Sequence, residues 1–329
     1  MTIPVLICDD SGFARKQMAR ALPENWDVEI HYSANGEECI EAIKEGKADV
    51  LFLDLNMPVM DGYEVLSMVR SLDLPTMIIV VSGDVQAEAY QRVIALGAMD
   101  FIKKPASPEK IAEILKQYGI HDQDSKGNRE VDLEVSVWDS YQEIANVAMG
   151  RAAELLAKML GVFVHAPIPI VSLSKRSQIR DLLVQTDEED DAVSVVSQGF
   201  IGKGIAGEAL LILNDSSFKD LEAISITQGM SDSTQLDLLL SVASILIGPC
   251  LNGIANQFDI QFGLGHPVIV GTHVESSNLG NNLVGNDKEV LTMRMGYAIE
   301  DYDINCSLVL LFTNDSIENL NHFASLLMD

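Results

Sequence analysis

Five polar residues follow short apolar runs in the first 120 residues, a placement that can bring their side chains together. In chain order they are Asp9, Asp10, Asp54, Ser82 and Lys104. Three carboxylates at one place repel one another, so they require a cation between them. A hard divalent ion such as Mg²⁺ takes oxygen ligands of this kind. One such aspartate alone could simply cap a helix, so the inference depends on the whole set.

A second polar group lies on the amphipathic helical pattern "DSYQEIANVAMG", residues 139–150. Asp139, Glu143 and Asn146 stand at i, i+4 and i+7, a spacing that usually carries apolar side chains. Glu143 and Asn146 share one helix face, so the two side chains could enter one cleft of a partner together. The alternative is an exposed polar stripe on a surface helix. Asp139 is either a helix N-cap or a member of the group.

Alternating strand and helix patterns must position the first group. The strand-like runs are "PVLICDD", "DVEIHYSA", "DVLFLDLNMP", "TMIIVVSGD" and "DFIKKP", and helical periodicity separates them. This alternation predicts an α/β domain over residues 1–120, a doubly wound sheet of five parallel strands. Ligands bind such sheets at the carboxyl ends of the strands, where the first polar group would gather.

This set, and above all "FLDLNMPVMDG", resembles the receiver domain of two-component response regulators. The resemblance implies that a sensor histidine kinase donates a phosphoryl group to Asp54. It also implies a Mg²⁺ site built from the carboxylates of Asp9, Asp10 and Asp54 and the backbone carbonyl of Asn56.

The same resemblance assigns roles to three further residues. Lys104 would pair with the phosphoryl group, Ser82 would hydrogen-bond to it, and Phe101 would turn inward when Ser82 moves. A phenylalanine here could also simply belong to the core. Pro105 stands where the family keeps a proline, commonly after a cis bond. Positive charge at this place fits the chemistry, because phosphorylating a carboxylate crowds negative charge that must be neutralised.

The rest of the chain divides at a polar stretch. "HDQDSKGNREVD", residues 121–132, has almost no apolar side chains and indicates a linker. The second domain would then span 133–329. Its acidic tract "QTDEEDDA", residues 185–192, indicates a solvated loop rather than a docking site.

An internal repeat divides the second domain into halves of about 133–230 and 231–329. The helix pattern "DSYQEIANVAMG" aligns with "DLLLSVASILIG" at 237–248, where Ser241 and Ser244 replace Glu143 and Asn146. The closely spaced strand patterns predict an antiparallel sheet with helices against it, an α+β domain with a pseudo-two-fold axis. They are "FVHAPIPIV", "AVSVVSQGF", "GEALLIL", "PVIVGTHV", "LTMRMGYAI" and "CSLVLLF".

One glycine motif in this domain does not indicate a nucleotide site. Gly202, Gly204 and Gly207 form GxGxxG in "GKGIAG". A dinucleotide fingerprint needs a helix next, whereas the residues that follow have the pattern of a strand.

The pattern D-x3-E-x2-N, followed by Pro169, resembles the CheC/CheX family of chemotaxis phosphatases, and the resemblance covers about residues 133–329. It implies hydrolysis of the acyl phosphate of a receiver domain. Glu143 would grip the receiver's lysine, and Asn146 would hold a water in line with the phosphorus. Ser241 and Ser244 depart from the pattern, so the second helix is expected to be structural.

Composition excludes several other classes. A net charge of -27 argues against nucleic acid and against an anionic membrane surface. The four cysteines are scattered, and none stands at zinc-ligand spacing from a histidine, which indicates buried thiols in a reducing compartment. No basic leader and no apolar stretch near the roughly 20 residues of a membrane span is evident. A cytoplasmic protein is expected.

These observations predict a response regulator that is phosphorylated on Asp54 and whose output domain hydrolyses the aspartyl phosphate of receivers. A separate receiver is the favoured substrate over the chain's own, because self-hydrolysis would erase the signal as it arrives. A non-catalytic adaptor for phosphorylated receivers or for chemotaxis or flagellar proteins is the alternative. A DNA-binding regulator is disfavoured by the charge. With one active helix per chain, enough surface stays free for pairing with a second copy.

Overall fold

The computed structural model describes residues 2–121, 131, 133–175, 192–227, 234–275 and 289–328. Two compact units divide the chain, Met1–Glu143 and Ile144–Leu327. Nearly all of the expected linker at 121–132, and the acidic tract at 185–192 up to its last residue, lie outside the described residues. The domain limits given above stay predictions.

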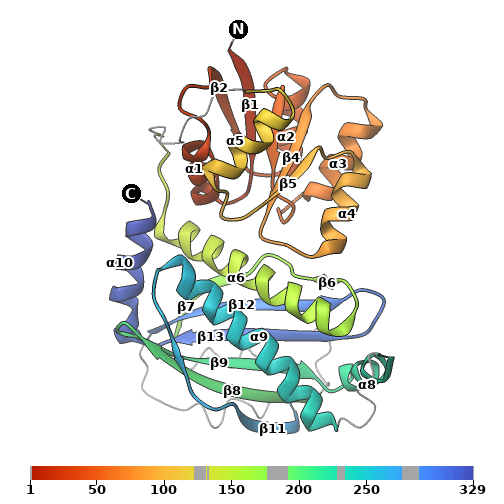
Figure 1. Cartoon of the computed structure of the whole chain (residues 1–329). Coiled ribbons are helices and arrows are strands. Elements are labelled where there is room, and N and C mark those ends of the chain that lie inside the picture. Colours follow the sequence, from red (N-terminus) through yellow and green to blue (C-terminus); the bar gives the residue numbers. More distant parts are fainter. Residues whose placement is uncertain are drawn as a thin grey trace. The chain divides into compact units, whose positions relative to one another are not determined.

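The first unit contains a five-stranded parallel sheet in the order β2-β1-β3-β4-β5 (Figure 1). Its strands are β1 Ile3–Cys8, β2 Val28–Ser33, β3 Val50–Leu53, β4 Met77–Ser82 and β5 Asp100–Lys103. Its helices are α1 Gly12–Ala21, α2 Gly36–Lys44, α3 Gly62–Ser71, α4 Ala87–Leu96 and α5 Pro108–Gln117. The predicted five-stranded α/β fold of this part is confirmed.

Helices cover both faces of this sheet, which explains why its inner strands β1, β3 and β4 are almost continuously apolar. One face packs against α2, α3 and α4, through residues such as Ile40 and Val65. The other face packs against α1 and α5, through residues such as Met18 and Ile111. Because the strands are parallel, their carboxyl ends meet at one edge, and the polar residues that follow them meet there too.

The second unit contains a sheet of eight strands in the order β10-β8-β9-β13-β12-β6, with β11 paired to β8 and β7 paired to β12. All of its pairings are antiparallel. The strands are β6 Val164–His165, β7 Ile170–Lys175, β8 Ala192–Gly202, β9 Ile205–Asn214, β10 Gly263–Leu264, β11 Val268–Glu275, β12 Glu289–Ile299 and β13 Asn305–Phe312. The arrangement agrees with the predicted α+β class.

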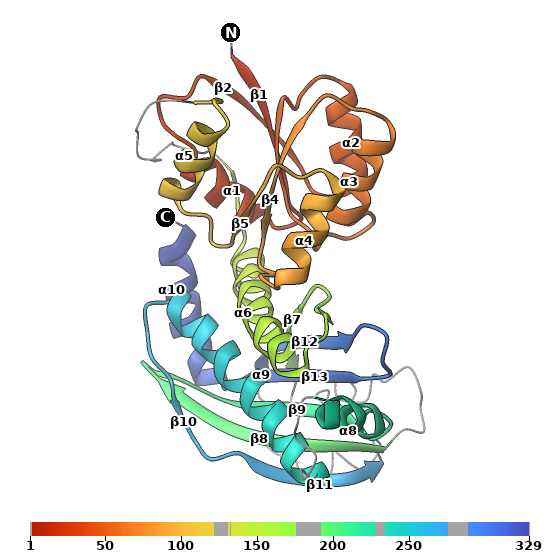
Figure 2. The ribbon, with the colours of Figure 1, turned by 45° about the vertical axis from the view of Figure 1, so that its right-hand side comes forward.

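Two long helices, α6 Val137–Leu160 and α9 Gln235–Gln257, lie side by side over one face of this sheet (Figures 1 and 2). The other helices among the described residues are α8 Ser217–Thr227, the short 3-10 helix η3 Asn314–Ser316, and α10 Ile317–Met328. At the crossing of α6 and α9, a Cβ on Gly253 would lie 2.9 Å from Cα of Ala148. Glycine at this position therefore allows the two backbones to approach closely.

Helix α9 corrects one expectation from the sequence. It has 23 residues and a window of mean hydropathy 2.0, so by length and composition it is long enough to cross a membrane. Within the second unit, 61% of that window is buried, including Leu239 and Leu246. Its apolar character is that of a core helix, whose buried side is matched by the sheet.

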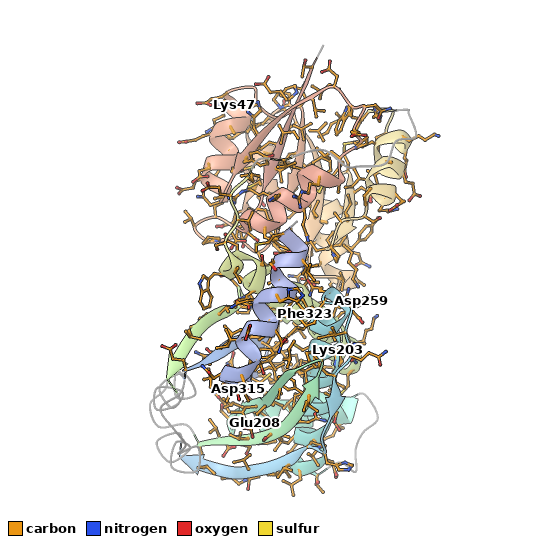
Figure 3. All side chains as sticks on the ribbon, turned by 90° about the vertical axis from the view of Figure 1, so that its left-hand side faces the viewer. Lys47, Lys203, Glu208, Asp259, Asp315 and Phe323 are labelled. Carbon is orange, nitrogen blue, oxygen red and sulfur yellow. The ribbon has the colours of Figure 1, made fainter. Side chains whose placement is uncertain are left out.

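Two further details bear on the predicted strands. "FVHAPIPIV" is not one strand but the separate strands β6 and β7, because Pro167 and Pro169 between them have no N–H to donate. In the GxGxxG segment, Lys203 and Gly204 form the tip of the β8–β9 hairpin, both with positive φ (Figure 3). The strand expected after that segment is confirmed as β9.

Candidate functional site

Three carboxylates gather at the carboxyl edge of the parallel sheet. Asp9 and Asp10 follow β1 and Asp54 follows β3, and their oxygen atoms lie within 4.8 Å of one another. Gly62, at the start of α3, fixes the loop after Asp54. Its N–H donates to the Leu55 carbonyl at 2.9 Å, and a Cβ here would lie only 2.3 Å from the Asp54 carbonyl oxygen.

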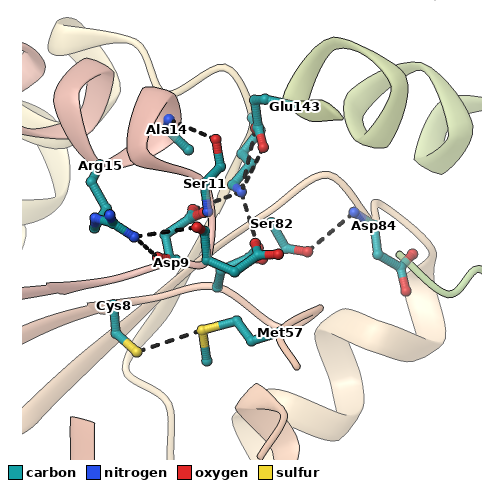
Figure 4. Close-up of polar contacts among 12 residues, drawn as sticks. Cys8, Asp9, Ser11, Ala14, Arg15, Met57, Ser82, Asp84 and Glu143 are labelled. Carbon is teal, nitrogen blue, oxygen red and sulfur yellow. Dashed lines mark hydrogen bonds and ion pairs between the residues drawn. The ribbon is translucent and has the colours of Figure 1, made fainter. Parts of the chain in front are cut away.

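The turn that carries Asp9 and Asp10 is held by α1. The Ser11 N–H donates to Oδ1 of Asp9 at 2.9 Å, and the Ser11 hydroxyl caps α1 by accepting from the Ala14 N–H. The Arg15 guanidinium donates to the backbone carbonyls of Asp9 at 2.6 Å and Asp10 at 3.3 Å (Figure 4). Sequence analysis missed Arg15. Its place one turn into the helix that follows the paired aspartates is the signal that could have indicated it.

Lys104 supplies the positive charge at the centre of the site. Its Nζ lies 2.7 Å from Oδ2 of Asp9 and 3.2 Å from Oδ1 of Asp54. The Lys104–Pro105 peptide is cis. Burial by itself would lower the pKa of Lys104, but Asp54, Asp9 and Glu143 around it raise that pKa well above its usual value. The lysine is therefore a permanent cation.

The donor set fits Mg²⁺. Neither carboxylate oxygen of Asp54 has a hydrogen-bond partner, although the group is buried, so its charge is only partly balanced by the ion pair with Lys104. Burial raises the pKa of Asp54 well above its usual value. Burial, and then the charge of Asp9, raise the pKa of Asp10 to about 6. A hard divalent cation bound by these oxygens would relieve both shifts.

The remaining receiver residues surround this centre. Ser82 ends β4, is fully buried, and accepts a hydrogen bond from the Asp84 N–H at 3.1 Å. Phe101 in β5 is partly buried, and its ring contacts Tyr90 edge-on at 6.2 Å. Asn56 lies in the loop after β3. The roles that the resemblance assigns to these three residues stay predictions.

Glu143 belongs to the same unit, because the first turns of α6 lie within Met1–Glu143. Its Oε1 lies 3.3 Å from Nζ of Lys104, and Oε2 accepts from the same group at 3.4 Å (Figure 4). Burial raises the pKa of Glu143 to about 7, although Lys104 opposes the shift. Glu143, Lys104 and Asp54 also line a cavity of about 20 Å³. That is room for one water molecule, which needs roughly 10–15 Å³.

Asp139 has a structural explanation. The Ser136 hydroxyl accepts from the Asp139 N–H, and the Asp139 carboxylate accepts from the Ser136 N–H, both at 3.2 Å. Ser136 is therefore the N-cap of α6, and Asp139 closes a capping box. Thr234 and Asp237 form the same box at the start of α9. Asp139 and Asp237 thus hold the same capping position in their two helices, and Asp139 is not itself the N-cap.

The other two positions differ between the helices. Asn146 is 7% exposed, and its amide makes no hydrogen bond to another described residue. On α9, the Ser241 hydroxyl donates to the Asp237 carbonyl at 2.7 Å, and that of Ser244 donates to the Leu240 carbonyl at 2.8 Å. Both serines are exposed and bonded to their own helix. In α9 these positions therefore offer little to a partner.

Comparison with known proteins identifies the first unit. The response regulator receiver domain family matches residues 5–116. Chemotaxis protein CheY of Thermotoga maritima is 33% identical over 113 residues, which cover 34% of this chain and 94% of that protein.

Two other similarities are narrower or more distant. A protein-glutamate methylesterase/protein-glutamine glutaminase of Geobacter sulfurreducens is 40% identical over 104 residues, 31% of this chain, and the chain spans only 28% of that enzyme's length. The crystal structure of Thermotoga maritima FliY aligns with a TM-score of 0.45 at 19% identity, covering 59% of this chain and 98% of that one. With its N-terminal unit matched to the receiver family and to almost all of a CheY protein, the chain belongs to the response regulator receiver family.

Proposed function

We propose that Asp54 is phosphorylated by a sensor histidine kinase in the cytoplasm, and that α6 belongs to an aspartyl-phosphate phosphatase that acts on receiver domains. The duplicated second domain, about 133–329, would be the phosphatase. The observation that supports this best is the ion pair of Glu143 with Lys104 at 3.3 Å, beside Asp54. It is the contact that the CheC/CheX resemblance implies between such a helix and a receiver's lysine.

The proposed chemistry needs no protein nucleophile. Glu143 fixes the register of the helix on the lysine of a receiver. Asn146 lies three residues further along the same helix face, and its amide can both donate to and accept from one water molecule. Mg²⁺ held by Asp9, Asp10, Asp54 and the Asn56 carbonyl would neutralise charge on the phosphoryl oxygens. Lys104 and Ser82 would contact the same oxygens, so α6 contributes mainly orientation.

A phosphate-release assay tests this proposal. Wild type, Asn146→Ala and the matched control Ser244→Ala are each incubated in Mg²⁺ with phosphorylated protein, both their own and a panel of separate CheY-type receivers. Loss of the water-orienting amide is expected to slow hydrolysis about a hundredfold on at least one substrate. Ser244→Ala, at the aligned position of α9, should hydrolyse like wild type.

The competing function is an adaptor that binds phosphorylated receivers, or chemotaxis or flagellar proteins, without hydrolysing the phosphate. An adaptor would leave every phosphate lifetime unchanged by Asn146→Ala, whereas a phosphatase variant would keep binding and lose turnover. Equal lifetimes across the whole panel, with the variant folded by circular dichroism, would end the phosphatase proposal.

A further inference from the structure

The lysine that Glu143 engages is the chain's own. The pair lies within one compact unit, and the two side chains are 4% and 5% exposed. Lys104 is the only partner that the described residues give to the Glu143 carboxylate. A separate receiver could use Glu143 only after this buried pair had been broken.

Exchanging the Glu143–Lys104 pair for an equivalent pair between Glu143 and the lysine of a separate receiver gives no electrostatic advantage. Separating the two partners of a buried ion pair leaves each charge uncompensated, which is strongly unfavourable. The own receiver also has an advantage in concentration, because about 20 residues join α5 to α6. Two groups on one chain meet at an effective concentration that is set by the connecting chain and not by the protein concentration.

A second distance within the same unit involves the first turn of α6. A Cβ on Gly12, in the first turn of α1, would lie 3.6 Å from Oδ2 of Asp139. Gly12 and Asp9 flank the turn that carries the acidic site. Within the first unit, the start of α6 thus lies beside the Lys104 ammonium and near the start of α1.

We infer that the substrate of the α6 site is this chain's own Asp54 phosphate, hydrolysed within the same molecule. This rests on the proposed function and names its substrate. In the step, the water oxygen bonds to phosphorus while the bond from phosphorus to the Asp54 carboxylate oxygen breaks. The carboxylate leaves with the bonding electron pair, and a water proton passes to the departing inorganic phosphate or to solvent.

The first test uses wild-type protein alone. The full chain is phosphorylated with acetyl phosphate in Mg²⁺, desalted, and followed over about a hundredfold range of protein concentration, since an intramolecular rate is independent of concentration. A constant first-order half-life is expected. A half-life that shortens in proportion to concentration would overturn the inference.

The second test asks whether the α6 helix of one chain hydrolyses the Asp54 phosphate of another chain. Phosphorylated Asn146→Ala is mixed with about a tenfold excess of unphosphorylated wild type, whose helix is intact but linked to another receiver. The phosphate of Asn146→Ala should still be lost slowly in the mixture. The matched Ser244→Ala protein should lose its phosphate at the wild-type rate, whether or not wild type is added. Acceleration by wild type would show hydrolysis between chains and overturn the inference.

The failures of the two proposals differ. If wild type and Asn146→Ala lose their own phosphate equally slowly while a separate receiver is dephosphorylated only by wild type, the proposed function stands and the inference falls. If no substrate distinguishes wild type from Asn146→Ala, both fall.

Discussion

Glu143 and Lys104 are separated by 39 positions in the chain, yet their charged groups lie 3.3 Å apart beside Asp54. The pair places a carboxylate next to the group that is expected to accept phosphate. Asp54 is 1% exposed in this arrangement. Little of Asp54 is therefore accessible to a phosphodonor, and we expect that Glu143 moves before the proposed phosphoryl transfer.

Removing that carboxylate should open the site. Glu143→Ala is expected to speed phosphorylation of Asp54 by acetyl phosphate about tenfold, equivalent to about 1.4 kcal/mol in barrier height. Initial rates are measured by intact mass in an Asn146→Ala background, so that hydrolysis does not contribute. Ser241→Ala in the same background is the control on α9. An unchanged rate would mean that Glu143 does not restrict access.

Lys104 should be essential for the stability of the first unit. Lys104→Met leaves buried Asp9, Asp54 and Glu143 without their shared cation, which is expected to cost about 3 kcal/mol in urea unfolding. Saturating Mg²⁺ should restore part of the loss, because a ligand of the native state stabilises it by mass action. The exposed pair of Lys110 and Glu113 serves as control. Lys110→Met should change stability by less than about 0.5 kcal/mol, and an equal loss in both variants would contradict the central role of Lys104.

The capping boxes predict matched effects in the two long helices. Ser136→Ala and Thr234→Ala should each lower the free energy of unfolding by about 1 kcal/mol. Asp139→Ala should have a similar effect on stability and should leave the rate of phosphate hydrolysis within about threefold of wild type, since its carboxylate satisfies backbone donors. Loss of hydrolysis in Asp139→Ala with unchanged stability would assign Asp139 to the chemistry instead.

Two glycines of α9 should respond oppositely to alanine. At Gly253 a Cβ would lie 2.9 Å from Cα of Ala148, whereas at Gly248 no atom lies within 4 Å. Gly253→Ala should destabilise by about 1–3 kcal/mol through overpacking. Gly248→Ala should stabilise by roughly 0.5–1 kcal/mol, because alanine favours helix. The unfolding temperatures of the two variants are compared with that of wild type. Equal shifts in both variants would contradict the close crossing of α6 and α9.

Local patterns were sufficient for much of the fold. The five strand patterns of the first part contain the five parallel strands, and the three inner strands are almost continuously apolar because they are buried on both faces. The capping box of Ser136 and Asp139 was also legible as S-x-x-D before an apolar run. The two prolines in "FVHAPIPIV" were a local signal that this segment would form two strands and not one.

Contacts between residues that are far apart in the chain leave no such local pattern. Nothing local indicates that Glu143 meets Lys104 of its own chain, since the pairing depends on how the chain returns after α5. Arg15 was missed because its hydrogen bonds go to two backbone carbonyls, so only its place one turn into the helix after the paired aspartates could have indicated it. The apolar length of α9 was underestimated because Asp237, Ser241 and Ser244 interrupt its outer side while its inner side stays apolar.

The start of α6 within the first unit has a consequence for signalling. Under the proposed function, the aspartate that accepts phosphate and the helix that removes it lie on one polypeptide, so every molecule would set the lifetime of its own phosphate. The duration of a pulse would then be independent of how many copies the cell makes. Protein abundance would set the amplitude of the response, and the residues at the start of one helix would set how long it lasts.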